Sequence, residues 1–146
     1  MPFVTKWLPL PRKFKIKTSM KQTLLLVLLT AAFVTASAQD VMHKEKDGTY
    51  IVNTTTLAQD VEGYAGATPV EVYIKKNKIV QVVMLKSQDG PKYTAKVKKT
   101  MLPQYEGMKV KDAQTIEVDG VTGATFTSKA VQENIRRAVE YYKKHK

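Results

Sequence analysis

The sequence predicts a small α+β domain in which an antiparallel sheet packs with helices, and two patterns carry this prediction. Residues 70–74 alternate between apolar and polar, and residues 78–85 are rich in β-branched side chains. Asn77 lies between them and tolerates the left-handed backbone of a tight turn, so these runs predict a β-hairpin. Towards the C-terminal end, apolar residues recur at helical spacing opposite a charged face. These residues are Val131, Ile135, Ala138, Val139 and Tyr142.

Weaker patterns predict the remaining elements. Residues 49–52 and residues 115–118 each resemble a short strand, the second by its polar and apolar alternation. Pro91 suits the first turn of a helix that extends to Thr100, before the Leu-Pro pair that follows. Residues 104–110 predict a compact loop or a short helical turn.

The first 38 residues have the layout of a secretory signal peptide. An apolar run, Leu24–Val34, precedes the small residues Ala36, Ser37 and Ala38, which predicts cleavage after Ala38. The run is shorter than the roughly 20 residues that span a bilayer. Met20 is an alternative start of translation. Six basic residues and no acidic ones precede the cleavage site: Lys6, Arg12, Lys13, Lys15, Lys17 and Lys21.

This interpretation divides the chain into a signal peptide (1–38), a flexible segment (39–47) and one domain (48–146). It predicts an extracytoplasmic location, in the periplasm or cell envelope, with membrane association as a further possibility. The chain has no cysteine, which excludes a lipoprotein anchor and a disulfide framework.

Composition argues against two classes of function. The chain has 24 basic and 13 acidic residues, but six of the basic ones lie in the leader, so its net charge of +11 falls to +5 without the leader. The remaining lysines are scattered and lack a nucleic-acid-binding motif, so no nucleic-acid partner is expected. His43 and His145 lie near opposite ends of the predicted domain, and no metal site is expected.

The segment from Asp119 to Thr127, which reads DGVTGATFT, carries the chemical signal. It lies between a predicted strand and the start of the last helix. The first turn of a helix leaves backbone N–H groups without partners. Two interpretations stay open from the residues alone: nearby hydroxyls cap the helix, or the helix start binds a phosphate group.

The same segment resembles the flavin attachment motif of the FMN-binding domain family, which includes the C subunit of the sodium-translocating NADH:quinone reductase and the G subunit of the Rnf complex. The resemblance covers residues 48–142. Residues 87–91 depart from the turn that many relatives have there, which puts flavin contacts from that loop in doubt. The positions that match the motif are Asp119, Thr122, Gly123, Ala124 and Thr125.

The resemblance implies that FMN is joined through its phosphate to the hydroxyl of Thr125. The motif offers no histidine, and no lysine before Lys129, to act as a base. A separate FMN transferase that uses FAD and a divalent metal is therefore the expected catalyst, and no residue of this chain is expected to be catalytic. Thr68, which ends a partial copy of the motif, lacks the matching acid and is followed by proline.

The resemblance also assigns expected roles to the other motif residues. Asp119 serves recognition by the transferase or holds the turn through its side chain. Gly123 and Ala124 allow close approach of the cofactor, and Gly120 belongs to the same cofactor-binding segment. Thr122 and Thr127 either donate hydrogen bonds to the phosphate or cap the helix. Tyr105 is either a core residue or a wall for the flavin ring.

The function expected from this resemblance is an exported flavoprotein domain that carries covalent FMN and transfers electrons in an extracytoplasmic redox chain. Its partners would be redox donor and acceptor proteins at the membrane. The domain on its own is expected to be a carrier or a reductase module, because it has no evident substrate domain. The alternatives are a flavin-dependent reductase of a small extracellular acceptor and a flavin-free secreted binding module.

Overall fold

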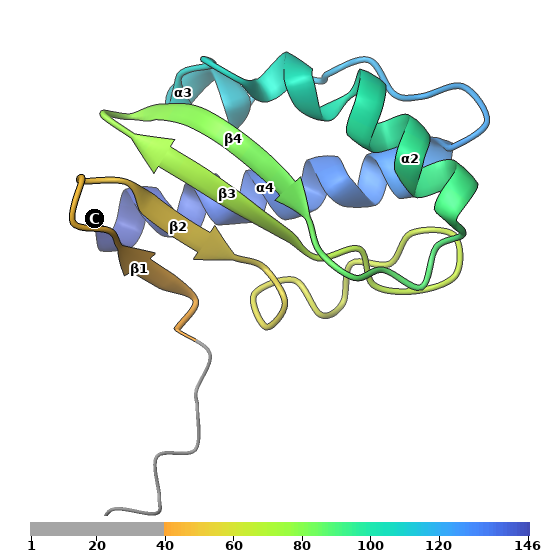
Figure 1. Ribbon diagram of the computed structural model, residues 1–146, viewed down its shortest axis with the longest axis horizontal. Helices are drawn as coiled ribbons and strands as arrows, with labels where there is room; N and C mark the ends of the chain where they lie inside the picture. Colours follow the sequence, from red (N-terminus) through yellow and green to blue (C-terminus); the bar gives the residue numbers. More distant parts are fainter. Residues whose placement is uncertain (1–39) are drawn as a thin grey trace, which may run out of the picture. The chain divides into compact units, whose positions relative to one another are not determined.

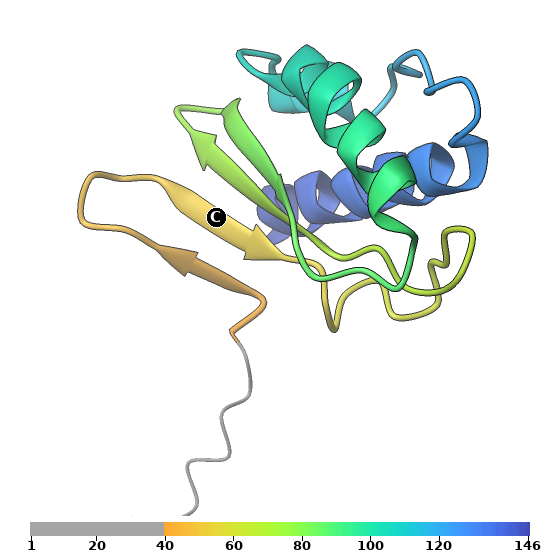
Figure 2. The same cartoon turned by 45° about the vertical axis from the view of Figure 1, so that its right-hand side comes forward.

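The protein is described by a computed structural model that covers residues 40–146, and the predicted signal peptide lies outside these residues. The described part is an α+β fold, as predicted. Its antiparallel sheet has the order β1-β2-β3-β4, and Figures 1 and 2 show the helices gathered on one side of it. The strands are β1 (Met42–Lys44), β2 (Tyr50–Asn53), β3 (Val70–Lys75) and β4 (Lys78–Met84). The helices are α2 (Pro91–Thr100), the 3-10 helix η1 (Leu102–Tyr105), α3 (Val110–Ala113) and α4 (Thr125–His145).

The predicted hairpin is confirmed as β3 and β4. Its turn residues Lys76 and Asn77 both adopt positive φ angles, 50° and 59°, which match the right-handed twist of the two strands. A register shift follows Tyr73, after which Ile74 pairs with Ile79. The hairpin therefore supplies one side of the sheet, with β4 as its edge strand.

The sheet also contains a strand that the sequence analysis missed. Residues 39–47 were expected to be flexible, yet β1 lies within them and pairs with β2, with Met42 opposite Val52. The turn that joins the two strands includes Gly48 at φ 86°. The Asp47 carboxylate accepts a hydrogen bond from the Thr49 N–H at 2.9 Å. This turn brings β1 onto the sheet although its own side chains are mostly exposed.

The strand predicted at residues 115–118 does not form, so that prediction was wrong. The segment has no pairing partner in the described sheet. Val118 is buried in the core, and the side-chain amide of Gln132 donates a hydrogen bond to its carbonyl oxygen. The polar and apolar alternation of this irregular segment therefore reflects the burial of Val118 alone. The Gln132 side chain supplies the hydrogen bond that a neighbouring strand would otherwise make to the Val118 carbonyl.

Helix α4 spans the fold and carries the apolar face that the sequence predicted. All five residues assigned to that face are buried, and α4 packs against β2, β3, α2 and α3. Asn134 is also buried; its Oδ1 accepts a hydrogen bond from the Thr54 hydroxyl at 2.6 Å, and its amide donates to the Ala130 carbonyl at 2.9 Å. Residues 39–146 form one compact unit, and the strands and helices of the described part supply its hydrophobic core.

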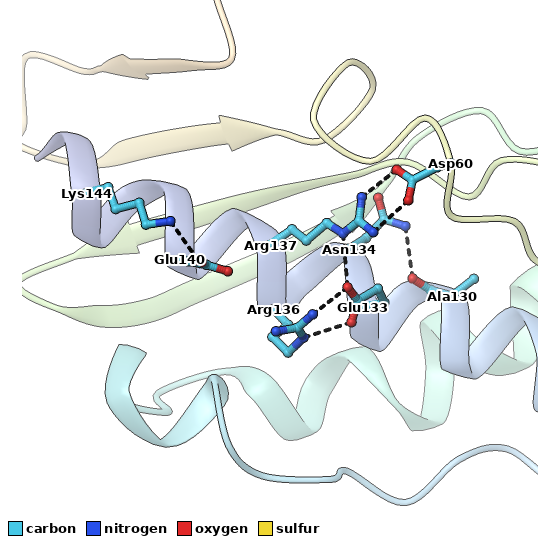
Figure 3. A network of polar contacts seen from close by, with 8 residues as sticks. All are labelled: Asp60, Ala130, Glu133, Asn134, Arg136, Arg137, Glu140 and Lys144. Atoms are coloured by element: carbon cyan, nitrogen blue, oxygen red, sulfur yellow. Dashed lines mark hydrogen bonds and ion pairs between the residues drawn. The ribbon is translucent and has the colours of Figure 1, made fainter.

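Charged residues on the outer face of α4 bind the loop that follows β2 (Figure 3). Arg137 donates to the carboxylate of Asp60 at 2.7 Å and to that of Glu133 at 2.9 Å. Hydrogen bonds from Arg136, aided by Arg137, hold the pKa of Glu133 below its usual value despite partial burial. The loop that leads towards Tyr64 is therefore fixed to the helix at one end.

None of the helices within residues 40–146 is long and apolar enough to cross a bilayer.

Candidate cofactor site

The site begins with three neighbouring hydroxyls at the start of α4, which have different environments. Thr127 is buried and donates to Asp89 Oδ2 at 2.5 Å. Ser128 is also buried, and its hydroxyl oxygen accepts a hydrogen bond from the Val121 N–H at 3.0 Å. Thr125 is exposed, and its hydroxyl makes no hydrogen bond with any residue in 40–146. Of the three hydroxyls, Thr125 alone is presented to solvent.

The first turn of α4 has no side-chain cap in the described structure. Ala124 occupies the N-cap position, and no side-chain oxygen bonds to the N–H groups that follow it. The first backbone bond within the helix comes from Ser128 N–H to the Ala124 carbonyl at 2.9 Å. The preceding N–H groups point out of the helix end, where the helix dipole favours an anion. This geometry favours phosphate binding over hydroxyl capping.

A cavity of about 270 Å³ adjoins this helix end and is walled by aromatic rings. The ring centroid of Tyr64 lies 5.9 Å from that of Tyr93 and 6.4 Å from that of Phe126. Tyr64 is 70% exposed and Phe126 is 65% exposed, although large apolar side chains usually gain by burial. The remaining lining runs from Gly123 to Thr127. An open apolar cavity beside an anion-binding helix end suits a flat aromatic group that carries a phosphate.

Asp89 fixes the loop that bears Tyr64 onto the start of α4. Its side chain is only 5% exposed, and its carboxylate accepts hydrogen bonds from the N–H groups of Tyr64 at 3.2 Å and Ala65 at 2.6 Å, besides the Thr127 hydroxyl. Burial by itself raises the pKa of Asp89, but these hydrogen bonds outweigh burial and leave that pKa below its ordinary value. In the sequence, residues 87–91 stand out only as a departure from the family pattern, and no local signal there indicates the role of Asp89.

Gly63 is packed tightly against the same carboxylate. A Cβ atom at this position would lie 2.2 Å from Asp89 Oδ2 and 2.8 Å from Thr68 Cγ2. We therefore expect Gly63→Ala to lower the free energy of unfolding by on the order of 2 kcal/mol through overpacking. Gly120→Ala is the control, because its added Cβ would have no neighbour closer than 3.6 Å. Urea unfolding of both variants measures this, and equal stabilities would contradict the expected clash.

Gly123 meets a different requirement. Its φ of 80° lies in the left-handed region, which side chains with a Cβ rarely adopt. The Lys96 ammonium of α2 lies 3.6 Å from where its Cβ would be, which brings a positive charge next to the motif. Ala124 is buried at the helix start. Gly123, Ala124 and Thr125 all line the cavity.

Three of the other motif residues lie outside the cavity, whereas Thr127 lines it. Thr122, Asp119 and Gly120 are exposed in the loop before the helix. Within the described residues the Asp119 carboxylate makes no hydrogen bond, so the turn-holding role expected for it has no support from a contact. The Thr127 hydroxyl, expected to bind phosphate or cap the helix, is instead bound to Asp89.

Thr68 and Tyr105 are both buried. Thr68 is fully buried, which agrees with its exclusion as an attachment site. Tyr105 is 1% exposed, and burial raises its pKa to about 12. It is a core residue and does not line the aromatic cavity. No cluster of three potential metal ligands exists among residues 40–146.

The fold and the site together define a small α+β domain with an aromatic-lined cavity at an uncapped helix start. The sequence model of the FMN-binding domain family matches residues 63–140, more than half of the chain. The chain belongs to the FMN-binding domain family. The match confirms the resemblance drawn from the motif, and FMN is the cofactor that this family membership supports.

Proposed function

We propose that this chain is an exported electron-transfer flavoprotein in which a phosphoester bond joins FMN to the hydroxyl of Thr125. The observation that carries the proposal is the position of this side chain. Thr125 is the exposed first residue of an uncapped helix and borders the aromatic cavity. The neighbouring hydroxyls of Thr127 and Ser128 are buried and hydrogen-bonded within the domain.

The domain does not supply the groups needed to make this bond. A threonine hydroxyl is a weak nucleophile without a neighbouring base, and no residue in 40–146 forms a hydrogen bond with that of Thr125. A transferase would therefore provide the base and a divalent metal. The Thr125 oxygen would attack the FMN phosphorus of FAD, the bond from that phosphorus to the AMP oxygen would break, and AMP would leave. The hydroxyl proton would pass to the base of the transferase.

The chain's own residues would hold the attached group. The free N–H groups of the first turn of α4 face the phosphate position, and Lys96 adds a positive charge close to Gly123. Tyr64, Tyr93 and Phe126 offer apolar faces for the ring. Bound FMN supplies reversible acceptance of one or two electrons, while the protein fixes its position and surroundings.

The openness of the site supports a carrier role. Tyr64 and Phe126 border the cavity and are mostly exposed, so a bound ring would keep an edge accessible to redox partners. Export beyond the cytoplasm and electron exchange with donor and acceptor proteins at the membrane belong to this proposal. A covalent bond would prevent loss of the cofactor by dilution in such a compartment. Family membership argues against the flavin-free alternative.

We expect the protein to carry no covalent flavin when it is produced in a host that lacks the transferase. Co-production with the transferase should add one FMN per chain, because the missing base and metal are then supplied. Intact mass and in-gel fluorescence under denaturing conditions measure this addition. Covalent flavin in the host without the enzyme would show that the domain catalyses its own modification.

A further inference from the structure

A group of lysines surrounds a second concavity, of about 370 Å³, at the other end of α4 from Thr125. The turn between β3 and β4, the start of α3 and the end of α4 meet here (Figure 1). Asn77 and Val110 complete the lining, and no acidic side chain takes part. The members of this lysine cluster are Lys76, Lys78, Lys109, Lys111, Lys143 and Lys146.

The fold holds these three segments together through Asn77. Its carbonyl accepts a hydrogen bond from the Val110 N–H at 3.0 Å. Its side-chain oxygen accepts hydrogen bonds from the Tyr142 hydroxyl at 3.0 Å and from Lys146 Nζ at 2.7 Å. The lysine cluster is therefore built on fixed backbone from α3, α4 and the hairpin turn.

The positive charge of the cluster is not neutralised by the domain. All six lysines are exposed, and none forms an ion pair with an acidic side chain in the described part of the chain. Ion pairs of lysines do occur elsewhere in the described residues, where Lys75 pairs with Asp47 at 2.8 Å and Lys144 pairs with Glu140 at 2.8 Å. Six like charges around one concavity are held close despite their mutual repulsion, which favours an anionic binding surface.

We propose that the lysine cluster binds the surface of a lipid bilayer that contains anionic phospholipids. Lysine is a compact charge on a flexible stem, which suits a fluid array of head groups, whereas arginine suits fixed bidentate recognition. The cluster contains no arginine, and its concavity is lined by no aromatic ring that would stack on a nucleic-acid base. These features favour a bilayer over a nucleic acid.

The position of the cluster also argues against a docking site for a redox partner, on the proposal that Thr125 carries the flavin. Lys143 follows Thr125 by 18 residues on one helix, which is a rise of about 27 Å. The rate of electron tunnelling falls exponentially with distance, so a redox partner bound at the lysine cluster would lie too far from a flavin on Thr125 for rapid electron transfer. A bilayer bound there would leave the aromatic cavity at the opposite end of α4 free for redox partners.

Vesicle co-sedimentation tests the proposal. The protein used should comprise residues 39–146, because the six basic residues of the predicted leader would bind anionic vesicles on their own. Residues 39–146 form a compact unit with a hydrophobic core. We expect binding to vesicles of phosphatidylcholine with about one third phosphatidylglycerol, weakening as salt screens the charges. No binding is expected to pure phosphatidylcholine. Equal binding to both vesicle types, or to neither, would overturn the proposal.

A matched pair of variants locates the surface. Lys109→Glu with Lys111→Glu should lower the partition coefficient onto anionic vesicles at least tenfold, since each lysine near such a surface contributes about a factor of five. Lys98→Glu with Lys99→Glu makes the same change in charge on exposed positions of α2, outside the cluster. This control should bind within a factor of about three of the unchanged protein.

Circular dichroism must show that both variants are folded before their binding is compared. A further pair, Lys109→Gln with Lys111→Gln, should lower binding to an intermediate degree, which separates charge from any change in folding. Equal losses in the cluster pair and the α2 pair would show a response to net charge alone and would refute the assignment. The experiment requires no flavin, so its failure would leave the proposed attachment at Thr125 untouched.

Discussion

Thr125→Ala is expected to abolish covalent flavin completely while leaving the domain folded. The change removes the one hydroxyl at the start of α4 that is exposed and makes no hydrogen bond within residues 40–146. Because this side chain caps nothing in the structure, the free energy of unfolding should change by no more than about 0.5 kcal/mol. Peptide mapping of protein co-produced with the transferase measures the modification, and urea unfolding measures stability.

Two companion variants make this result specific. Thr125→Ser keeps a hydroxyl at the same place and should still accept flavin, because the proposed acceptor oxygen is retained. Thr122→Ala removes an exposed hydroxyl three residues earlier and should still be modified at Thr125. Flavin found on any other residue of the Thr125→Ala protein would mean that the attachment site is wrongly assigned.

Asp89→Ala is expected to cause the largest loss of stability among the changes discussed, on the order of 3 kcal/mol. It leaves the N–H groups of Tyr64 and Ala65 and the hydroxyl of Thr127 without their charged acceptor, and hydrogen bonds to charged groups are the stronger kind. Because the loop that bears Tyr64 is then released from α4, flavin loading should fall as well. Thermal unfolding should show a decrease in Tm of about 10 to 20 °C.

The control for this variant is Asp60→Ala. Asp60 also joins a loop to α4, through Arg137, but its side chain is 70% exposed. Exposed ion pairs contribute little, so we expect a loss below about 1 kcal/mol. Equal losses in the free energy of unfolding of the two variants would show that the buried hydrogen bonds of Asp89 stabilise the fold no more than an exposed ion pair does.

Acidification should reveal the same interaction. The pKa of Asp89 in the folded protein lies below its ordinary value of 3.8, because the hydrogen bonds from Thr127, Ala65 and Tyr64 outweigh the effect of burial. A carboxylate with a depressed pKa stabilises the fold at pH values above the ordinary pKa, and this stabilisation is lost as pH falls through the folded pKa. The difference in stability between the unchanged protein and Asp89→Ala should therefore be constant near neutral pH and shrink below pH 3.8. A difference that grew on acidification would contradict the depressed pKa.

Local patterns were sufficient to predict the β3–β4 hairpin, α2 and α4. Each combines a clear periodicity with a matching turn or terminus, such as Asn77 between the strands and Pro91 at the start of α2. The same reasoning failed where a strand depended on its partner. Strand β1 has three residues and little burial of its own, so pairing with β2 defines it. Residues 115–118 alternate as a strand does but have no neighbour with which to pair.

The candidate site divides in the same way. The motif around Thr125 is contiguous, and the sequence analysis located it. The aromatic cavity is not contiguous, because Tyr64, Tyr93 and Phe126 come from three separate segments. The contacts of Asp89 join residues 24 to 38 positions away along the chain. Neither arrangement leaves a periodic or motif signal, so only the fold reveals them.

The burial of Thr127 and Ser128 has a consequence for the order of events during maturation. An unfolded chain would expose three alcohols within four residues, at Thr125, Thr127 and Ser128. Folding withdraws two of these alcohols into the interior and leaves one accessible. On the proposal that Thr125 carries FMN, modification after folding would therefore be the order that yields a single product.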